Sequence, residues 1–419
     1  MNVLIFCDGF NAPAYVPRVR YLCEYFSAKG WNLNLITEFI ENQKLIPDNF
    51  PTLTVKYYRY KKGILSKIEW FFKIVLNFIY DDKGSFFYQK SQKFIRNKKF
   101  DLVLCSCTWH SFPLTTAAKV AKKLNLPFFA DLRDIAEQTP IENNAIFVHK
   151  FPSFLGKIIT KKYKKIHINR RNKVIKKAVC ITSVSNWHVQ FLRQFNPNTH
   201  LIYNGFDENF FIPNVQKSDK FFISYFGTVY SEKMSNPKVL FEAIKNIKNK
   251  NSAKNVQVRW FVDENSKKII QKLAQQFDIE EFVSCKDFVY KNELLFEMNN
   301  SSILVVLCNA ANTQNFSGIM TTKFFEYIGV NRPILCTPNN NDELAETINA
   351  IGCGLVSSDV EEVENFILEK YAEWQKNGFT KGTVLEENRE KFSRKNGAEI
   401  LEKLFLEQRT KTASLKEQR

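Results

Sequence analysis

The stretch Ser317-Gly-Ile-Met-Thr-Thr-Lys-Phe-Phe-Glu-Tyr-Ile-Gly-Val-Asn-Arg-Pro-Ile-Leu-Cys336 predicts a loop, a helix and a buried strand in succession. A loop that leads into a helix presents free backbone N–H groups and the positive end of the helix dipole, which suit a diphosphate. Lys323 and Glu326 are three residues apart and therefore share a helix face. A cation for phosphate beside a carboxylate for sugar hydroxyls suits a nucleotide-sugar site. The alternative is an ordinary ion pair on a helix surface.

Short apolar segments alternate with longer amphipathic segments along most of the chain. Before residue 203 the predicted strands are 3–6, 33–36, 54–59, 102–105, 128–130 and 179–182. The pattern then starts again, with predicted strands at 222–226, 256–262 and 303–307. Near-continuous apolar strands that alternate with helices predict parallel sheets covered on both faces. We therefore expect an α/β fold of two doubly wound Rossmann-like domains that face each other across a cleft.

The length of 419 residues predicts two or three domains. We expect an N-terminal Rossmann-like domain at 1–202 and a C-terminal one at 203–385. Asn204-Gly205 is a strong turn signal at this boundary, and a hinge is the simplest interpretation of it. Residues 386–419 form a Lys/Glu-rich helical tail that we expect to pack back on the N-terminal domain.

The net charge of +17 favours anionic partners, which include phosphates, nucleic acid and anionic lipid surfaces. No helix-turn-helix, zinc-finger or aromatic RNA-binding pattern accompanies the charge, so no nucleic acid is expected as a partner. The stretch 150–177 mixes many Lys and Arg residues with Phe and Ile, and 57–78 is of similar character. Such a basic amphipathic segment suits an anionic membrane surface, and the alternative is a solvated helix face.

The cysteines indicate the compartment. Nine cysteines are scattered along the chain, several of them in apolar strand-like runs, and none has a zinc-site spacing. The N-terminus reads as a buried strand rather than a signal peptide, and no apolar run is long enough to span a bilayer. We therefore expect a cytoplasmic protein with reduced thiols, peripheral at the inner face of the membrane.

Open parallel sheets bind ligands at the carboxyl ends of their strands, and several polar or glycine-containing segments follow predicted strands. Gly9 lies in a loop after the first strand, where the backbone is able to approach a diphosphate. His110 follows the strand at 102–105 and has the proton-transfer capacity of imidazole. Gly227 and Thr228 end the first strand of the second half, with Lys233 or Lys238 within reach of a phosphate. For each, a purely structural role is the alternative.

Charged residues also follow the strand at 128–130. Asp131, Arg133 and Asp134 lie within four positions, which is poor material for a core. Arg133 is able to pair with either carboxylate or to hold an anion with two hydrogen bonds.

These segments together resemble a known family. The stretch Leu126-Pro-Phe-Phe-Ala-Asp131-Leu-Arg133-Asp134 resembles the strand and "DxRD" signature of retaining glycosyltransferases of the GT-B fold, in the large family-4 group. Asn204-Gly205-Phe206-Asp207 resembles their "NGxD" turn, and Phe226-Gly227-Thr228 resembles their loop at the donor phosphates. Lys323-Phe-Phe-Glu326-Tyr resembles the "K-x-FEY" form of their donor motif. The order and spacing of the motifs carry the resemblance, since each motif is short.

The resemblance implies a nucleotide-diphosphate sugar as donor substrate, bound mostly by the C-terminal domain, and an acceptor bound by the N-terminal domain. Glu326 would hold the ribose hydroxyls, while Lys233 or Lys238, together with Lys323, would neutralise the leaving diphosphate. The donor-binding set that it implies is Gly9, Asn204, Gly227, Thr228, Lys233, Gly318, Ile319, Met320, Thr321, Lys323 and Glu326. The catalytic set is His110, Asp131, Arg133 and Asp134. The resemblance implies neither a metal nor a resident cofactor.

Two positions depart from the family pattern. Gly318 stands where the family usually has a second Glu that contacts the hexose, and Thr228 stands where an Arg is customary. The donor sugar therefore stays open. The expected function is transfer of a sugar, with retention, to a glycan or lipid-linked acceptor in the synthesis of a bacterial-type surface polysaccharide, lipopolysaccharide included. The alternatives are a sugar-nucleotide epimerase of the same architecture and a catalytically inactive basic binding or scaffold protein.

Overall fold

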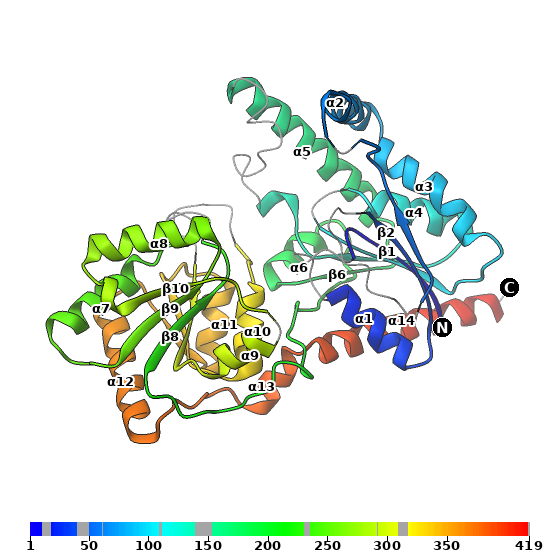
Figure 1. The fold of residues 1–419 in the computed structure, drawn as a ribbon. Helices are drawn as coiled ribbons and strands as arrows, with labels where there is room; N and C mark the ends of the chain where they lie inside the picture. The colour runs from blue at the N-terminus through cyan, green and yellow to red at the C-terminus, as the bar shows by residue number, and fades with distance from the viewer. Residues whose placement is uncertain are drawn as a thin grey trace. The chain divides into compact units, whose positions relative to one another are not determined.

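The computed structural model describes residues 1–10, 18–39, 50–60, 62–108, 111–138, 153–229, 235–290, 292–308 and 317–417. The contacts within the chain divide it into two compact units (Figure 1). The first unit comprises Met1–Asn204 together with Gly397–Arg419, and the second comprises Gly205–Asn396. Each unit contains one parallel sheet with helices on its faces, so the predicted pair of doubly wound α/β domains is confirmed.

The sheet of the first unit has seven strands in the described residues, in the order β3-β2-β1-β4-β5-β6-β7. Their bounds are β1 Asn2–Cys7, β2 Asn32–Glu38, β3 Thr52–Val55, β4 Leu102–Cys107, β5 Phe128–Leu132, β6 Cys180–Ser183 and β7 Thr199–Leu201. The order runs outward in one direction from β1 and in the other from β4. The point at which the strand order reverses therefore lies between β1 and β4, where open sheets bind ligands.

Helices cover both faces of this sheet (Figure 1). The helices of this unit are α1 Arg18–Ala28, α2 Ile64–Ile79, α3 Asp82–Ile95, α4 Leu114–Leu124, α5 Ser153–Ile175, α6 Asn186–Arg193 and most of α14 Arg394–Glu417, and among them α2 packs on α3. Successive residues of β1 enter opposite cores, with Leu4 and Phe6 on one side and Val3 and Ile5 on the other. The side of Val3 and Ile5 is closed by an apolar stripe of α1 and by Phe405 of α14. This burial on both faces is why β1 reads as a continuous apolar run.

The sheet of the second unit has six described strands in the order β10-β9-β8-β11-β12-β13. Their bounds are β8 Phe221–Phe226, β9 Val256–Phe261, β10 Val283–Lys286, β11 Ile303–Leu307, β12 Ile334–Thr337 and β13 Gly354–Val356. The helices are α7 Lys238–Asn249, α8 Glu264–Phe277, α9 Asn292–Asn299, α10 Thr322–Val330, α11 Glu343–Ile351, α12 Val360–Asn377 and α13 Glu386–Lys391. Here the strand order reverses between β8 and β11, which places the ligand-binding edge of this sheet at their carboxyl ends.

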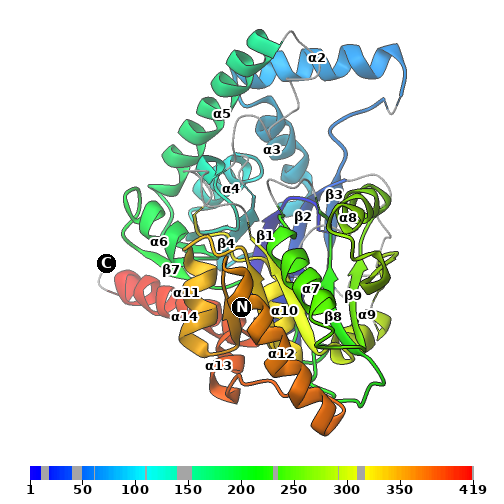
Figure 2. The ribbon, with the colours of Figure 1, turned by 90° about the vertical axis from the view of Figure 1, so that its left-hand side faces the viewer.

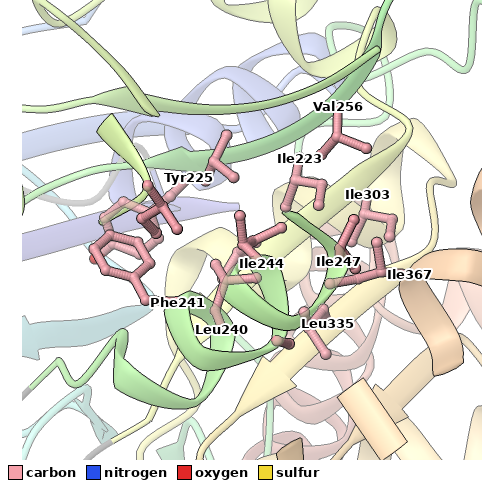
Figure 3. Close-up of a cluster of buried hydrophobic side chains, with 14 of the residues drawn as sticks. Ile223, Tyr225, Leu240, Phe241, Ile244, Ile247, Val256, Ile303, Leu335 and Ile367 are labelled. Atoms are coloured by element: carbon pink, nitrogen blue, oxygen red, sulfur yellow. The ribbon is translucent and has the colours of Figure 1, made fainter. Parts of the chain in front are cut away.

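One face of this second sheet is covered by α7 and α12. Leu240, Ile244 and Ile247 recur at helical spacing on α7 and pack against Ile223 of β8, as Figure 3 shows. Ile367 of α12 joins the same buried cluster. These side chains are fully buried, so their removal from water stabilises the unit and holds β8 rigidly.

The strand predicted at 54–59 is shorter in the structure, where β3 ends at Val55. The backbone N–H groups of Arg59 and Tyr60 donate to the Glu69 carboxylate of α2 instead of to a neighbouring strand. A side chain thus satisfies the backbone groups that a longer strand would have placed in the sheet.

Candidate functional site

Gly227 and Lys323 meet at the point where the strand order of the second sheet reverses. Gly227 directly follows β8, and Lys323 lies in the first turn of α10. Gly227 has a φ of +128°, and a Cβ atom built on it would lie 2.3 Å from Cε of Lys323 and 2.8 Å from its Nζ. The lysine side chain therefore occupies the space that any other residue at 227 would fill.

The Tyr225 ring lies beside the Lys323 ammonium. Its Nζ lies 5.4 Å from the centroid of the Tyr225 ring, within cation–π range. The Tyr225 hydroxyl donates to the carbonyl oxygen of Thr228 at 3.0 Å, which fixes the loop after β8. Burial lowers the pKa of Lys323 from its usual 10.5, and the Glu326 carboxylate acts in the opposite direction. A cation that is only partly exposed is thus held beside a glycine at the end of a buried strand.

Glu326 lies one helical turn further along α10. Burial raises its pKa to about 7, although Arg394 and Lys323 both act to lower it. A carboxyl group with this pKa is able to exchange between acceptor-only and donor forms near neutral pH. Arg394 lies close enough to act on Glu326 and is buried. The sequence prediction did not include Arg394, which lies 68 positions after Glu326 and carries no local motif.

The turn at Asn204-Gly205 explains how Arg394 reaches this position. Gly205 has a φ of +64°, and a Cβ atom there would lie 2.9 Å from the backbone N of Arg394. The N–H of Phe206 donates to the carbonyl oxygen of Phe392 at 3.1 Å, and the N–H of Arg394 donates to the carbonyl oxygen of Phe206 at 2.8 Å. Asn204 itself leaves its Oδ1 atom buried without a hydrogen-bond partner.

The Phe206 ring also packs against α10 at Gly329. A Cβ atom on Gly329 of α10 would lie 2.8 Å from the Phe206 ring, so the helix and the ring are in close contact. The turn therefore positions both the helix with Glu326 and the segment with Arg394.

The loop before α10 contains the other predicted donor-binding residues. The N–H of Gly318 donates to both carboxylate oxygens of Asp342, each at 2.9 Å, and Asp342 also caps α11. Met320 is buried and Ile319 is exposed. Thr321 is the N-cap residue of α10, but its side chain makes no capping hydrogen bond. At the start of a helix the first N–H groups have no carbonyl partner one turn earlier. In α10 the Phe324 N–H donates to the carbonyl of Thr321 at 3.2 Å, and the N–H groups of Thr322 and Lys323 precede it.

In the first unit Asp131 is fully buried on β5. Its carboxylate accepts hydrogen bonds from Arg18 at 2.9 Å, from the Ser106 hydroxyl at 2.7 Å and from the Thr182 hydroxyl at 2.7 Å. Burial raises the pKa of Asp131, but Arg18 and the two hydroxyls outweigh it, so the net pKa is below the usual value. The same Arg18 donates to the carbonyl oxygens of Ile202 at 2.9 Å and of Tyr203 at 2.6 Å.

Arg133 lies at the end of β5 and forms an ion pair with Asp8 at the end of β1. The other Asp8 oxygen accepts from the N–H of Thr108 at 2.9 Å and from its hydroxyl at 2.7 Å. Asp8 and Thr108 follow β1 and β4, the two strands between which the order of this sheet reverses. Gly9, next to Asp8, has a φ of +57° and is buried.

Asp134 differs from its neighbours because it is exposed. The surrounding protein displaces water from around the Asp134 carboxyl group, and this desolvation raises its pKa from the usual 3.8. The positive charge of Arg133 acts to lower the pKa, and the negative charge of Asp8 acts to raise it.

The predicted residues therefore form two groups, one in each unit. Asp131, Arg133 and Gly9 gather at the carboxyl edge of the first sheet, and the residues around Lys323 gather at that edge of the second. His110 and Lys233 lie outside the described residues. Within the described ranges, no three His, Cys, Asp or Glu side chains come together as a metal site.

The sequence matches no protein-family model and no curated protein. Solved structures resemble it along nearly the whole chain. HepE of Anabaena, solved in complex with UDP, is 12% identical, with a TM-score of 0.61 over 97% of this chain and 100% of that one. A glycosyltransferase from Rickettsia africae is 13% identical, with a TM-score of 0.62 over 97% of this chain and 98% of that one.

A UDP-GlcNAc 2-epimerase from Methanocaldococcus jannaschii is also similar, at 14% identity and a TM-score of 0.51, over 96% of this chain and 99% of that one. At such identities the likeness shows the fold alone, and that fold is GT-B.

Proposed function

We propose that the protein is a glycosyltransferase that takes its sugar from a nucleotide-diphosphate donor. The observation that carries the proposal is the meeting of Gly227, Lys323 and the start of α10 where the strand order of the second sheet reverses. A cation, free helix N–H groups and a glycine without side chain together suit a diphosphate. The complex of HepE with UDP supports the same ligand class in a protein of this fold.

Each residue has a chemical role in the proposal. Lys323 neutralises the diphosphate as it leaves, and Gly227 lets a phosphate approach the backbone closely. Glu326 accepts hydrogen bonds from ribose hydroxyls, with Arg394 stabilising its carboxylate form. Charge that develops on the leaving group is thereby met by groups already in place, which lowers the barrier without a protein nucleophile. In this proposal the cations take the part that a metal ion plays in other transferases, and activity in the presence of a chelator tests it.

The acceptor is bound by the first unit in this proposal. The exposed Asp134, with its raised pKa, is the carboxyl group of the Asp131–Asp134 segment that is accessible to a substrate. Asp131 is inaccessible and acts by positioning Arg18 and the Ile202–Tyr203 backbone. The acceptor class, a glycan or lipid-linked glycan of surface polysaccharide synthesis, and the retention of configuration rest on the motif resemblance.

The epimerase alternative is supported by the likeness to the UDP-GlcNAc 2-epimerase, which has the lower TM-score. The scaffold alternative is favoured by Gly318, since a family carboxylate is missing there and its N–H is bonded to Asp342. The transferase and the epimerase both bind a nucleotide sugar but convert it into different products, whereas the scaffold binds none. One screen therefore separates the three functions.

The experiment is a thermal-shift screen of nucleotide sugars, followed by NMR of the stabilising compound after incubation with the protein. A transferase releases the nucleoside diphosphate and the free sugar slowly in the absence of acceptor, and the anomer released first reports the stereochemistry. Conversion of the compound into its epimer without release would favour the epimerase. No shift with any nucleotide sugar would contradict the proposal and favour the scaffold.

A further inference from the structure

Helix α2 is exposed on its apolar side. Its residues Ile64, Ile68, Phe71, Val75 and Ile79 recur every three or four positions and form one stripe along the helix. All five are exposed, and Ile64 and Ile79 reach 75% and 73% exposure. Leu65 and Phe72 beside the stripe are exposed as well, at 57% and 61%. A soluble helix normally turns such a stripe toward the core.

The polar side of α2 faces the protein instead. Glu69, Lys73 and Asn77 form a second stripe, and Asn77 is the buried residue of this helix. Glu69 accepts from the backbone N–H groups of Arg59 and Tyr60, at 2.9 and 3.0 Å. Lys73 donates to the carbonyl of Tyr57, and Asn77 donates to the Tyr57 hydroxyl at 2.9 Å. These hydrogen bonds hold the helix in its orientation, so the outward apolar stripe is a fixed feature of the unit.

The first turns of α5 continue the exposed surface. Phe154 and Leu155 are exposed at 73% and 49%, while Gly156 and Thr160 face inward. The rings of Phe78 on α2 and Tyr163 on α5 are 5.3 Å apart, so the two helices are in contact. Figure 2 shows α2 and the start of α5 at the same end of the first unit. We call this surface, made by the exposed residues of α2 and of 154–165, the α2–α5 face.

The charges around the α2–α5 face indicate its partner. Helix α5 contains no Asp or Glu, and Glu69 is the single acid of α2 and faces inward. The exposed cations of the face are Lys67, Lys157, Lys161, Lys162 and Lys165. Tyr80, the residue that follows α2, is exposed, and an aromatic ring suits the level of lipid headgroups.

We propose that the α2–α5 face docks on an anionic lipid bilayer, with α2 lying in the plane of the headgroups. The apolar stripe enters the acyl boundary and the lysines contact lipid phosphates. A second copy of this chain is a poorer partner, because joining two such faces would bring like charges together. At 16 residues α2 is about 24 Å long, and its inward polar stripe is incompatible with spanning a bilayer. None of the helices in the described residues has the length and apolarity that spanning requires.

The sequence indicated 150–177 as the membrane-docking segment and 57–78 as a segment of similar character, and the α2–α5 face draws on both. The lysines of α5 supply charge, as the sequence indicated, but most of the exposed apolar area comes from α2. The docking proposal is independent of the proposed reaction. An epimerase or a scaffold protein with this structure would present the same α2–α5 face.

The test is flotation of the full-length protein with vesicles of phosphatidylcholine, with and without phosphatidylglycerol. Wild type is expected to bind the anionic vesicles. The triple variant Ile68→Ser/Phe71→Ser/Phe72→Ser should bind at least about tenfold more weakly, because burial of each large apolar side chain contributes more than 1 kcal/mol. The control Ile212→Ser/Leu385→Ser removes exposed apolar residues of the second unit and should bind like wild type.

Folding and partner identity are checked on the same variants. The replaced side chains are exposed, so the melting temperature in solution should stay within a degree or two of wild type. Wild-type binding by the triple variant, or no binding by wild type, would overturn the proposal. So would light scattering that shows a wild-type dimer and a monomeric triple variant, since a second copy would then cover the face. If the triple variant still bound the vesicles and salt abolished that binding, docking would depend on the lysines alone. This result would also contradict the insertion of α2.

Discussion

Gly227 and Lys323 are a matched pair, because the side chain of one occupies the space that the other leaves. The pair explains the role of the short segment Phe226-Gly227-Thr228, in which the glycine makes room for the lysine. The glycine at the end of β8 is needed both for its φ of +128° and for the approach of the lysine. The cation is thereby held beside the start of α10, where an anion is stabilised by helix and ammonium together.

Gly227→Ala should therefore weaken the binding of uridine diphosphate by at least about tenfold, since the methyl group displaces the lysine and strains the backbone. Gly30→Ala is the matched control, because Gly30 also has a positive φ of +76° but has open space around its Cβ position. Gly227→Ala should also lose more stability than Gly30→Ala, so binding is compared at a temperature at which both variants are folded. Calorimetric titration in which both variants bind equally well would remove Gly227 from the site.

Glu326 makes stability depend on pH in an unusual direction. Its folded-state pKa of about 7 is above its usual 4.5, so the folded protein holds this proton more tightly than the unfolded chain does. The stability that this gives is fully present below pH 4.5 and is lost as the pH rises through 7.

Glu326→Gln cannot ionise, so it should be more stable than wild type at pH 8, by about 3 kcal/mol, and similar to it near pH 4.5. Urea unfolding of both proteins at several pH values measures the difference. Parallel pH profiles for the two proteins would show that Glu326 is not buried in the way described.

At the scale of elements, α14 closes the first unit although it is distant in sequence. Phe405 is fully buried and its ring lies 4.6 Å from that of Phe129 on β5. The Glu402 carboxylate accepts from Lys29 at 2.6 Å and from the Tyr25 hydroxyl at 2.9 Å, so α14 is also tied to α1.

Phe405→Ala should destabilise the protein by about 3–4 kcal/mol, because it leaves a cavity between α14 and the sheet. The neighbouring Leu406 is 44% exposed, and Leu406→Ala should change stability by less than about 1 kcal/mol. Thermal unfolding compares the two directly. An equal effect of both substitutions would contradict the packing of α14 on the sheet.

The alternation of apolar strands and helices predicted both sheets, because strands buried on two faces read as continuous apolar runs. The strand predicted at 303–307 has the same bounds in the structure, where it is β11. The orientation of α2 was not predictable, since periodicity reveals two faces but not which of them meets the protein. Arg394 was missed because its approach to Glu326 depends on the pairing of Phe206 with Phe392, which no local pattern encodes. Asp342 was missed for the same reason, as its bond to Gly318 joins separate loops.

At the scale of the whole molecule, each unit presents its polar residues where the strand order of its sheet reverses. Asp8 and Thr108 meet there in the first unit, and Gly227 meets Lys323 there in the second. The same rule of open parallel sheets thus gives two sites of different character, one rich in carboxylates and hydroxyls and one with a lysine and free helix N–H groups. In the proposed transferase the first site would bind the acceptor and the second the donor.

A nucleoside diphosphate that binds the folded protein should raise its stability by about 2.7 kcal/mol at a concentration one hundred times its dissociation constant. The increase should vanish in Lys323→Gln, while Lys238→Gln, at the start of α7, tests the other lysine that the sequence placed near the phosphates. Stabilisation that survives in Lys323→Gln but is lost in Lys238→Gln would move the phosphate site to α7.

The most direct test of the account is hydrogen–deuterium exchange of the full-length protein with and without uridine diphosphate. We expect slower exchange in peptides that contain Phe226–Thr228 and Ser317–Val330, with no change in peptides of the first sheet around Asp131. Protection of the Asp131 region without protection at α10 would contradict the assignment of the donor site to the second unit.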